Sequence, residues 1–277
     1  GDVYKRQVGA PVGQTPTVQV RDAASGTVLS QILAYDAGFT GGVRTAVADV
    51  TGDGVPDVLV APGRGGGPAV GVFSGVDGTR VASLFAFEPR FTGGITVAAG
   101  DLDGDGIAEI VVGSGNGGGP RIRLFHGGDF ALVADFFAFE PSFRGGVNVA
   151  VGNFGNGNEI VAAPGDGGGS VVKRFDPDTL ETTRSYQIFE SAYRSGLNVA
   201  VGDLDGDGIA DIVAGAAADS SRIRAIAFDG TTLANFFAGP ANAAGGVEVQ
   251  IPPASPLRIL TRIRGVESEF PVDDLLG

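Results

Sequence analysis

The sequence contains no cysteine, no methionine and no tryptophan, and it has a single histidine. Without cysteine there is no disulfide framework and no thiolate chemistry, although this absence does not by itself choose a compartment. With one histidine and no cysteine, a nucleophile, a base and an orienting group cannot be combined in the usual way. We therefore predict that the chain is not an enzyme, while a pair of carboxylates acting on glycosides stays open.

Positive charge is scarce as well. Lysine and arginine together number 19 against 32 aspartate and glutamate residues, which gives a formal net charge of −13. This balance disfavours a nucleic-acid backbone or an anionic membrane surface as a partner, and it makes cations the natural partners. No apolar run reaches the ~18 residues of a membrane-spanning helix, so we expect no membrane insertion.

Long amphipathic helices are missing from the pattern too. The chain has 48 glycines and 15 prolines, and these residues interrupt every stretch that could carry a helical apolar period. Short runs with alternating apolar residues recur instead, which favours an all-β fold. The glycines follow no strict three-residue rule, so collagen is excluded.

What the sequence does contain is a dense cluster of carboxylates. Asp203, Asp205, Asp207 and Asp211 lie in one short stretch together with two glycines. Four like charges this close repel one another strongly unless a cation lies among them. Oxygen ligands in a flexible, glycine-containing loop suit Ca²⁺. The stretch is thus predicted to be a calcium loop.

The acidic loop recurs along the chain. Related stretches begin at Asp49, Asp101 and Asn153, a spacing of 50 to 52 residues, so the chain is an array of one repeated unit. An EF-hand is excluded, because position 12 of each loop is Val or Ala instead of a bidentate Glu and the flanks are strand-like.

Calcium is predicted at three of these loops, about three sites in all. Side-chain oxygens and the main-chain carbonyl at position 7 should supply the ligands. The expected ligands are Asp49, Thr51, Asp53, Val55, Asp57, Asp101, Asp103, Asp105, Ile107, Glu109, Asp203, Asp205, Asp207, Ile209 and Asp211. The loop at 153–159 is shorter and has Asn153 and Gly155 where carboxylates belong, so we expect it to be empty.

Each repeat contains four short strands, and four antiparallel strands in about 50 residues are typical of a β-propeller blade. Ala98, Ala150 and Ala200 leave one face of each first strand nearly bare, which predicts that this strand is innermost. Complete blades of this all-β propeller are predicted at 43–90, 95–142, 147–192 and 197–240, with partial blades at 8–36 and from Val247. The two partial blades could complete one another, which would close a ring of five, but a fragment of a larger propeller is the favoured interpretation.

The combination of motifs resembles the FG-GAP or VCBS-type repeat family, which is related to the propeller of integrin α chains. The resemblance rests on the acidic loops, on the glycine-rich turns at 65–68, 117–120 and 167–170, and on the Phe-x-Gly-Gly junctions at Phe39, Phe91 and Phe143. It implies a Ca²⁺-stabilised propeller, extracellular or on the cell surface, that serves adhesion or binds a glycan or protein surface. The propeller domain of a polysaccharide-degrading lyase or glycosidase stays open as the alternative.

The two ends depart from the repeat. Lys5 falls where a loop carboxylate belongs, and residues 2–7 match the translation of a transposon adapter used in sequencing libraries. We therefore expect 1–7 to be a non-native, adapter-derived segment, 8–251 to be the propeller, and 252–277 to be a degenerate last repeat or tail. The chain is expected to be a fragment of a larger protein, so a missing signal peptide does not bear on secretion.

The blade junctions repeat an acid three residues before an aromatic residue. The pairs are Asp36 and Phe39, Glu88 and Phe91, Glu140 and Phe143, and Glu190 and Tyr193. Aromatic packing and a capped turn are one interpretation.

A ring of ligand contacts that includes Arg90, Arg144 and Arg194 is the other interpretation. We expect any ligand face on this rim, where the turns at 63–68, 115–120 and 165–170 should expose backbone groups. His126, in a hairpin turn, is interpreted as a surface residue and not as a base.

Overall fold

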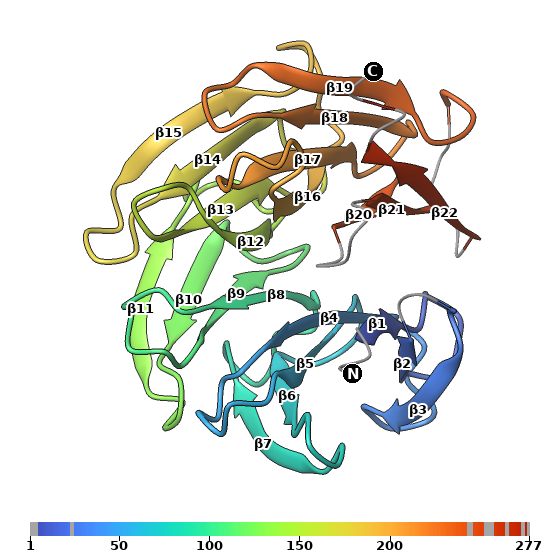
Figure 1. Ribbon diagram of the computed structural model, residues 1–277, viewed down its shortest axis with the longest axis vertical. Helices are drawn as coiled ribbons and strands as arrows, with labels where there is room; N and C mark the ends of the chain where they lie inside the picture. Colours follow the sequence, from blue (N-terminus) through green and yellow to red (C-terminus); the bar gives the residue numbers. More distant parts are fainter. Residues whose placement is uncertain are drawn as a thin grey trace.

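The sheets of the protein form a ring of blades. The computed structural model describes residues 5–22, 25–242, 246–251, 258–263, 266–272 and 275. Six antiparallel sheets result, four with four strands and two with three. Figure 1 shows them around a common axis in chain order, which confirms the predicted all-β propeller. Within this described part, no helix is long and apolar enough to cross a membrane.

The first strand of each complete blade is innermost, as predicted. These strands are β4 (Val43–Ala48), β8 (Ile95–Gly100), β12 (Val147–Asn153) and β16 (Leu197–Gly202). They line a central channel of about 550 Å³ together with β20 (Glu248–Gln250). Ala98, Ala150 and Ala200 lie on the channel wall, because strands that converge near the axis leave little room for larger side chains.

The second strands form the buried layer of each blade. They are β5 (Asp57–Pro62), β9 (Glu109–Ser114), β13 (Asn158–Pro164) and β17 (Asp211–Ala216). Every residue of β5, β9 and β17 is buried, since neighbouring blades cover both faces. This burial explains why these strands have continuous apolar runs where an alternating pattern would otherwise be expected.

The third and outer strands complete each blade. The third strands are β6 (Ala69–Phe73), β10 (Arg121–Phe125), β14 (Val171–Phe175) and β18 (Arg222–Ile226). The outer strands are β7 (Arg80–Phe85), β11 (Leu132–Phe137), β15 (Thr182–Gln187) and β19 (Thr232–Phe237). Each pair shifts register before the last residue of the third strand, a bulge that bends the exposed edge.

The two terminal blades are separate three-stranded sheets. They are β1 (Lys5–Gly9), β2 (Thr17–Asp22) and β3 (Val28–Leu33), and β20 with β21 (Arg258–Ile263) and β22 (Val266–Pro271). The partial blades predicted at both ends are present, but the idea that they complete one another is wrong. Val249 of β20 pairs with Thr261, because 258–271 supplies β20 with strands of its own, so the blades number six.

Residues set aside as adapter-derived also take part in the first sheet. Strand β1 begins at Lys5, which pairs with Asp22, and Gln7 pairs with Val20. The fold therefore uses part of 1–7 as a strand, whatever the origin of these residues. Their origin outside the native protein stays a prediction.

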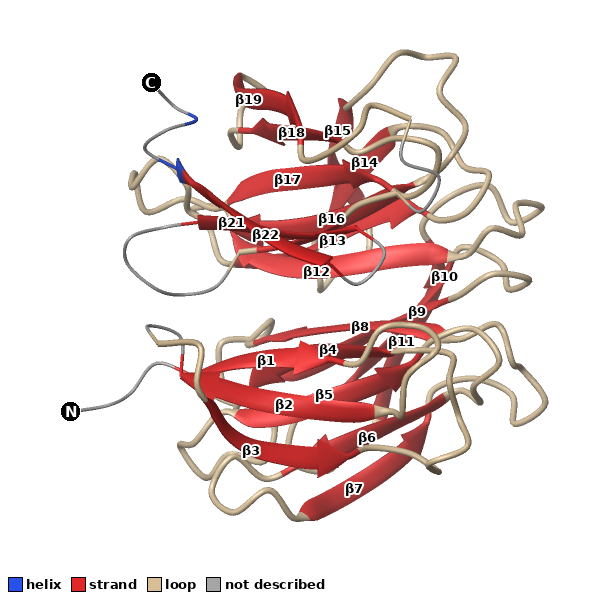
Figure 2. Ribbon diagram, turned by 90° about the vertical axis from the view of Figure 1, so that its right-hand side faces the viewer, coloured by secondary structure: helices blue, strands red, loops and turns tan. Residues whose placement is uncertain are grey.

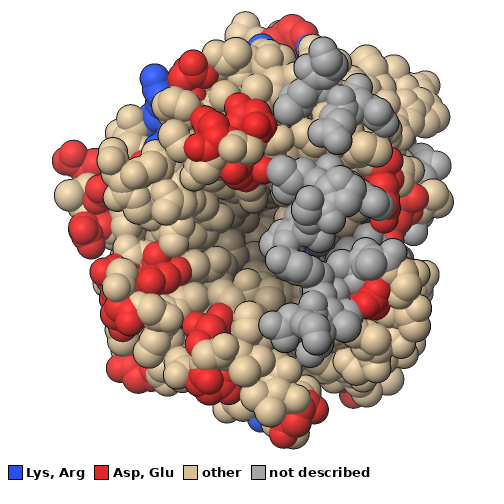
Figure 3. Space-filling model, in the orientation of Figure 1, with Lys and Arg blue, Asp and Glu red and all other residues tan. Residues whose placement is uncertain are grey.

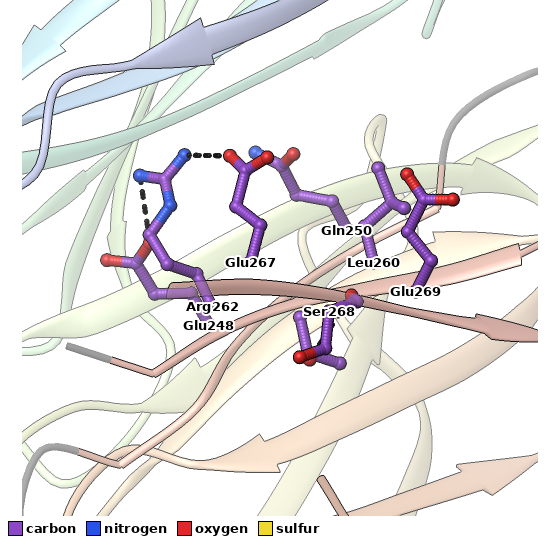
Figure 4. Close-up of a pocket in the computed structure, with 8 residues that line it drawn as sticks. Glu248, Gln250, Leu260, Arg262, Glu267, Ser268 and Glu269 are labelled. Carbon is purple, nitrogen blue, oxygen red and sulfur yellow. Dashed lines mark hydrogen bonds and ion pairs between the residues drawn. The ribbon is translucent and has the colours of Figure 1, made fainter. Parts of the chain in front are cut away.

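Arg262 joins the last blade to the first. Its Nη1 donates a hydrogen bond of 3.0 Å to the carbonyl of Gly9, and the same side chain lies 3.4 Å from Glu248 Oε2 and 3.1 Å from Glu267 Oε1. Figure 4 shows both carboxylates converging on this guanidinium. Only 12 % of the arginine side chain is exposed, so these pairs are less screened than ordinary surface pairs. One largely buried side chain thus links the last blade to the first.

Neighbouring blades are held together by apolar packing and by a repeated hydrogen bond near the axis. Each of the five hydrophobic clusters of described residues spans two successive blades. The second residue of each inner strand also donates to the first carbonyl of the next inner strand. The bonds are Arg44 to Ile95 at 3.2 Å, Thr96 to Val147 at 2.9 Å, Asn148 to Leu197 at 2.7 Å and Asn198 to Val247 at 2.9 Å.

The close approach of blades makes a specific prediction about glycine. Gly94 and Gly78 both have φ of +76°, but a Cβ on Gly94 would lie 2.5 Å from the backbone of Gly63, whereas one on Gly78 would meet nothing. Both Ala variants should lose ~1–2 kcal/mol from the left-handed backbone. Gly94→Ala should lose roughly 1–3 kcal/mol more from the overlap. Chemical denaturation of the two variants measures the difference, and equal losses would contradict this account of blade packing.

Candidate metal loops and outer rim

The predicted metal loops lie at one end of the ring. The loops at 49–57, 101–109 and 203–211 connect β4 to β5, β8 to β9 and β16 to β17, so all three occupy the end where second strands begin. Figure 2 shows the blades from the side, with the loops at the two ends of the strands. Figure 3 views the end with the acidic loops, where Asp and Glu side chains surround a central hollow.

The first aspartate of each loop holds the backbone in place. Asp203 accepts hydrogen bonds from the amides of Gly206 at 2.7 Å and Gly208 at 2.9 Å, and Asp101 and Asp49 do the same in their own loops. Gly206 and Gly208 have φ of +79° and +84°, a conformation that other residues adopt only with strain. The D-x-x-G-x-G spacing therefore encodes a loop whose shape is set by its own carboxylate.

The carboxylate at position 9 is buried beneath each loop. Asp57, Glu109 and Asp211 are 0 %, 3 % and 1 % exposed, and Asp211 accepts a 2.7 Å hydrogen bond from the amide of Leu204. Burial raises the pKa of Asp211 to about 7, and the nearby Asp205 and Asp207 add to the effect. Burial also raises the pKa of Glu109, with Asp103 and Asp105 contributing. A cation in the loop would stabilise the ionised form of these groups.

Two of the three loops gather carboxylates closely enough to hold a metal ion. Ligand atoms of Asp101, Asp103 and Asp105 lie within 4.8 Å of one another, as do those of Asp203, Asp205 and Asp211. Hard oxygen ligands of this kind fit Ca²⁺. That Ca²⁺ is the ion, and that the carbonyls of Val55, Ile107 and Ile209 bind it, stay predictions.

The loop at 49–57 fits a metal on a different observation. Its carboxylates form no such close group among the described residues. Thr51 Oγ1, however, is buried and has no hydrogen-bond partner in the described part of the chain. A hydroxyl without a partner at a ligand position suits a metal-bound oxygen, because a buried polar atom otherwise loses the stabilisation of a hydrogen bond.

The loop at 153–159 has an arginine beside its carboxylate. Arg174 makes a bidentate pair with Glu159, at 3.0 Å and 2.6 Å, and its guanidinium lies 3.7 Å from the ring centre of Phe154. The corresponding residues of the other third strands are Val72, Leu124 and Ala225. The partly buried carboxylate of Glu159 is thus paired with a side chain of its own blade, which is a physical reason for predicting an empty loop.

The loops also connect neighbouring blades. The amide of Ala108 donates to the carbonyl of Asp49 at 2.8 Å, Asn158 donates to Asp101 at 2.6 Å, and Ala210 donates to Asn153 at 2.7 Å. Each of these bonds joins the loop of one blade to the first residue of the loop before it. A metal that orders one loop therefore also supports the adjacent blade interface.

At the opposite rim, the junction aromatics pack as the structural interpretation predicts. Phe39, Phe91 and Tyr193 make edge-on contacts with Tyr35, Phe87 and Phe189, with ring centroids 5.9, 6.0 and 5.1 Å apart. Phe143 lies over Gly145, where an added Cβ would come within 2.3 Å of the ring. Packing of the junction aromatics is confirmed.

The glycine-rich turns are less available than expected. The amides of Gly13, Gly65 and Gly117 donate to the junction carbonyls of Thr40, Thr92 and Arg144 at 2.7, 2.9 and 2.8 Å. The expectation that the turns at 63–68 and 115–120 expose their backbone groups is wrong for the amides of Gly65 and Gly117, because each turn contacts a junction there.

The junction arginines are likewise held by their own turns. Arg144 donates to the carbonyls of Pro141 and Phe143, and Arg194 donates to those of Ser191 and Tyr193.

His126 lies nearer to the metal loops than its interpretation as a surface turn residue implied. It follows β10 and faces the loop at 101–109, with Nε2 3.9 Å from both Asp103 Oδ2 and Asp105 Oδ2. A hydrogen bond with Asp129 raises the pKa of His126. Strand order could have revealed this position, since Phe125 pairs with Ile110 and residue 126 therefore lies across from Glu109.

The sheets arranged around a common axis define a β-propeller. Residues 49–112 match the FG-GAP-like repeat family and residues 195–230 match the FG-GAP repeat. These matches support the resemblance seen in the sequence, while the relation to integrin α chains stays a prediction. A comparison with curated proteins gave no match.

Solved structures with the same fold have diverse descriptions. A protein of unknown function from Bacteroides caccae aligns with a TM-score of 0.54 at 13 % identity, over 92 % of this chain and 82 % of that one. The Dos1 propeller aligns with a TM-score of 0.54 at 13 % identity, over 98 % and 65 %.

Rhamnogalacturonan lyase PL11 from Bacillus licheniformis aligns with a TM-score of 0.55 at 16 % identity, over 93 % of this chain and 57 % of the lyase. At these identities the likeness shows the fold alone.

Calcium should stabilise the protein through the loops at 101–109 and 203–211. Sites with dissociation constants of roughly 10⁻⁴–10⁻³ M contribute about 0.4–1.4 kcal/mol each at millimolar Ca²⁺. Melting curves with EDTA and with excess Ca²⁺ should therefore differ measurably. Asp103→Ala and Asp205→Ala should each remove part of the difference, and Asn153→Ala should not. Superimposed curves would contradict the metal assignment.

The metal-free protein should become more stable as the pH falls through 7. The pKa of Asp211 is about 7 in the fold and near 3.8 without it, so the folded state holds its proton more tightly. The ionised carboxylate of Asp211 therefore destabilises the fold fully above pH 7, and this destabilisation disappears as the carboxyl is protonated at lower pH. Melting temperatures in EDTA over a pH series test this, with Asp211→Asn as the variant that should lose the dependence. A metal-free stability that only falls with decreasing pH in this range would show that Asp211 stays ionised.

Proposed function

We propose that this protein is a calcium-stabilised β-propeller that binds glycans at the outer edges of its blades. The observation that supports this proposal is an exposed phenylalanine beside a fixed arginine and carboxylate, which occurs in two blades. Counted along the chain from β1, the third blade consists of β8 to β11 and the fifth of β16 to β19. The residues are Phe137, Arg121 and Glu88 at the third blade and Phe237, Arg222 and Glu190 at the fifth.

The two sets share one geometry. Arg121 lies directly opposite Phe137 on neighbouring strands, as Arg222 lies opposite Phe237, so each pair shares a face of its sheet. Arg121 reaches the preceding blade, where it donates to Glu88 at 2.9 Å, and Arg222 donates to Glu190 at 2.7 Å. Each set therefore lies at the boundary between two blades.

The polar members are pre-organised and charged. Arg121 also pairs with Asp135, and the hydrogen bonds to these carboxylates raise the pKa of Arg121. Its guanidinium in turn contributes to holding the pKa values of Glu88 and Asp135 below their usual range. Fixed donors and acceptors lose little conformational entropy when they bind a ligand.

The aromatic members are available for contact. Phe137 is 49 % exposed and Phe237 is 51 % exposed, unlike the half-buried aromatics of the junctions. A flat apolar ring next to hydrogen-bonding groups suits a sugar, which offers an apolar face of C–H groups and a rim of hydroxyls. Two such sets on one molecule would raise the apparent affinity for a repeating polysaccharide.

Metal binding and location belong to the same proposal. Weak, oxygen-only Ca²⁺ loops function where calcium is millimolar, and this supports an extracellular or cell-surface setting. The likeness to rhamnogalacturonan lyases is consistent with contact with polysaccharides, and it leaves the lyase alternative as an outcome to be tested. Catalysis would need a carboxylate pair unlike those of the other blades. The two sets differ at one position, where Arg121 binds Asp135 and Arg222 binds Asn235.

A glycan array probed with and without Ca²⁺ tests the proposal. Phe137→Ala and Phe237→Ala should each weaken binding several-fold, and the double variant should weaken it further because avidity is lost. Phe85→Ala is the matched control, since Phe85 has the same strand position and 62 % exposure but faces Ala69 in place of an arginine.

Binding to a protein and to no glycan would overturn the glycan assignment. Rhamnogalacturonan incubated with the protein, followed by the ultraviolet absorbance of unsaturated products, should show no turnover. Turnover would establish the lyase alternative.

A further inference from the structure

The chain's one histidine lies beside one of the three acidic loops. One ligand atom each of Asp103, Glu109 and His126 lie within 4.8 Å of one another. Glu109 comes from the start of β9 and His126 from the turn after β10, so the antiparallel pairing of these strands fixes their approach. The group therefore combines an imidazole nitrogen with carboxylate oxygens on a rigid sheet end.

A further carboxylate orients the imidazole. Asp129 Oδ1 lies 3.2 Å from His126 Nδ1 and is itself held by the amide of Ala131 at 3.0 Å. With Nδ1 donating to Asp129, Nε2 faces Asp103 and Asp105 with its lone pair. A carboxylate that accepts a hydrogen bond from a histidine in this way is common beside metal sites, where it fixes the ring orientation.

The other blades lack this nitrogen. The residue that corresponds to His126 is Ser74 in the second blade, Asp176 in the fourth and Ala227 in the fifth, because each follows the third strand at the same register. The loop at 203–211 is thus a natural comparison, with a similar set of carboxylates and no nitrogen donor.

We propose that the loop at 101–109 and His126 form a mixed nitrogen and oxygen site for a first-row transition-metal dication such as Mn²⁺, Co²⁺ or Zn²⁺. Imidazole suits these ions, whereas Ca²⁺ takes oxygen ligands almost exclusively. The inference rests on the proposed cation-binding role of the loops and adds a distinct selectivity to one of them.

The separations are compatible with such an ion. Metal–nitrogen and metal–oxygen distances near 2.0–2.2 Å place two ligand atoms at most about 4.4 Å apart on opposite sides of the metal. His126 Nε2 lies 3.9 Å from Asp103 Oδ2 and from Asp105 Oδ2. The exposed side chains of Asp103, Asp105 and His126 can close the remaining gap by rotation, while Glu109 stays fixed by the amide of Leu102 at 2.7 Å.

The test measures metal binding directly on the full chain, produced without a polyhistidine tag. Titration with Co²⁺, followed by visible absorption, and with Zn²⁺, followed by calorimetry, should detect one site whose affinity falls at least about 10-fold in His126→Ala. Asp129→Asn should cause a smaller loss. The Ca²⁺-dependent shift in melting temperature should be unchanged in His126→Ala.

The fifth blade supplies the reciprocal variant. Ala227→His should create a second Co²⁺ site if a histidine at this position is enough, and Asp205→Ala should remove it again. Identical Co²⁺ and Zn²⁺ binding in the wild type and His126→Ala would overturn the inference and leave the calcium proposal intact. A wild type that binds Co²⁺ but shows no Ca²⁺-dependent shift in melting temperature would overturn the calcium proposal and leave the inference intact.

An increase in Ca²⁺ affinity in His126→Ala, with no transition-metal site in the wild type, would also overturn the inference. It would show that the imidazolium acts as an internal counter-charge.

Discussion

The burial of carboxylates at the start of the second strands is the constraint on which this propeller depends. Asp57, Glu109, Glu159 and Asp211 are placed beneath a loop at the blade end, and three of them are buried almost completely. A buried anion close to other anions is unfavourable unless a positive charge compensates for it. Because the loops also bond to one another from blade to blade, the compensation affects the interfaces of the ring as well as the loops.

The repeats meet this constraint in different ways. In the fourth blade the cation is a guanidinium, since Arg174 pairs with Glu159 and lies over Phe154. In the fifth blade the carboxylates are gathered as an oxygen-only set, and in the third blade an imidazole lies beside them. In the second blade a threonine hydroxyl without a partner takes a ligand position. The repeated unit thus keeps the carboxylate and varies the groups around it.

The opposite rim and the outer strands divide packing from recognition. The junction aromatics pack against other rings, and amides of the glycine-rich turns donate to junction carbonyls. Few of these groups therefore stay free to bind a ligand. At the ends of the outer strands β11 and β19, Phe137 and Phe237 are exposed beside ion pairs that bridge blades. The recognition surface proposed here therefore lies where the fold no longer needs the side chains for its own packing.

The sequence by itself determined the repeat, the four-stranded blades and the acidic loops, because period, strand alternation and the D-x-D-x-D-G spacing are local properties of the chain. It also indicated which loop departs from the pattern, since Asn153 and Gly155 replace carboxylates.

Only the tertiary structure decided the rest. The count of six blades depended on how β20 pairs. The counter-charge of Glu159 depended on Arg174 of a neighbouring strand. The position of His126 depended on the register of β10 with β9. The use of Phe91 in packing and of Phe137 at the surface was also undecided in the sequence, where nothing local distinguishes the two phenylalanines. Each of these features depends on residues that are far apart in the sequence and meet across strands or blades. The local sequence pattern carries no information about which of them meet.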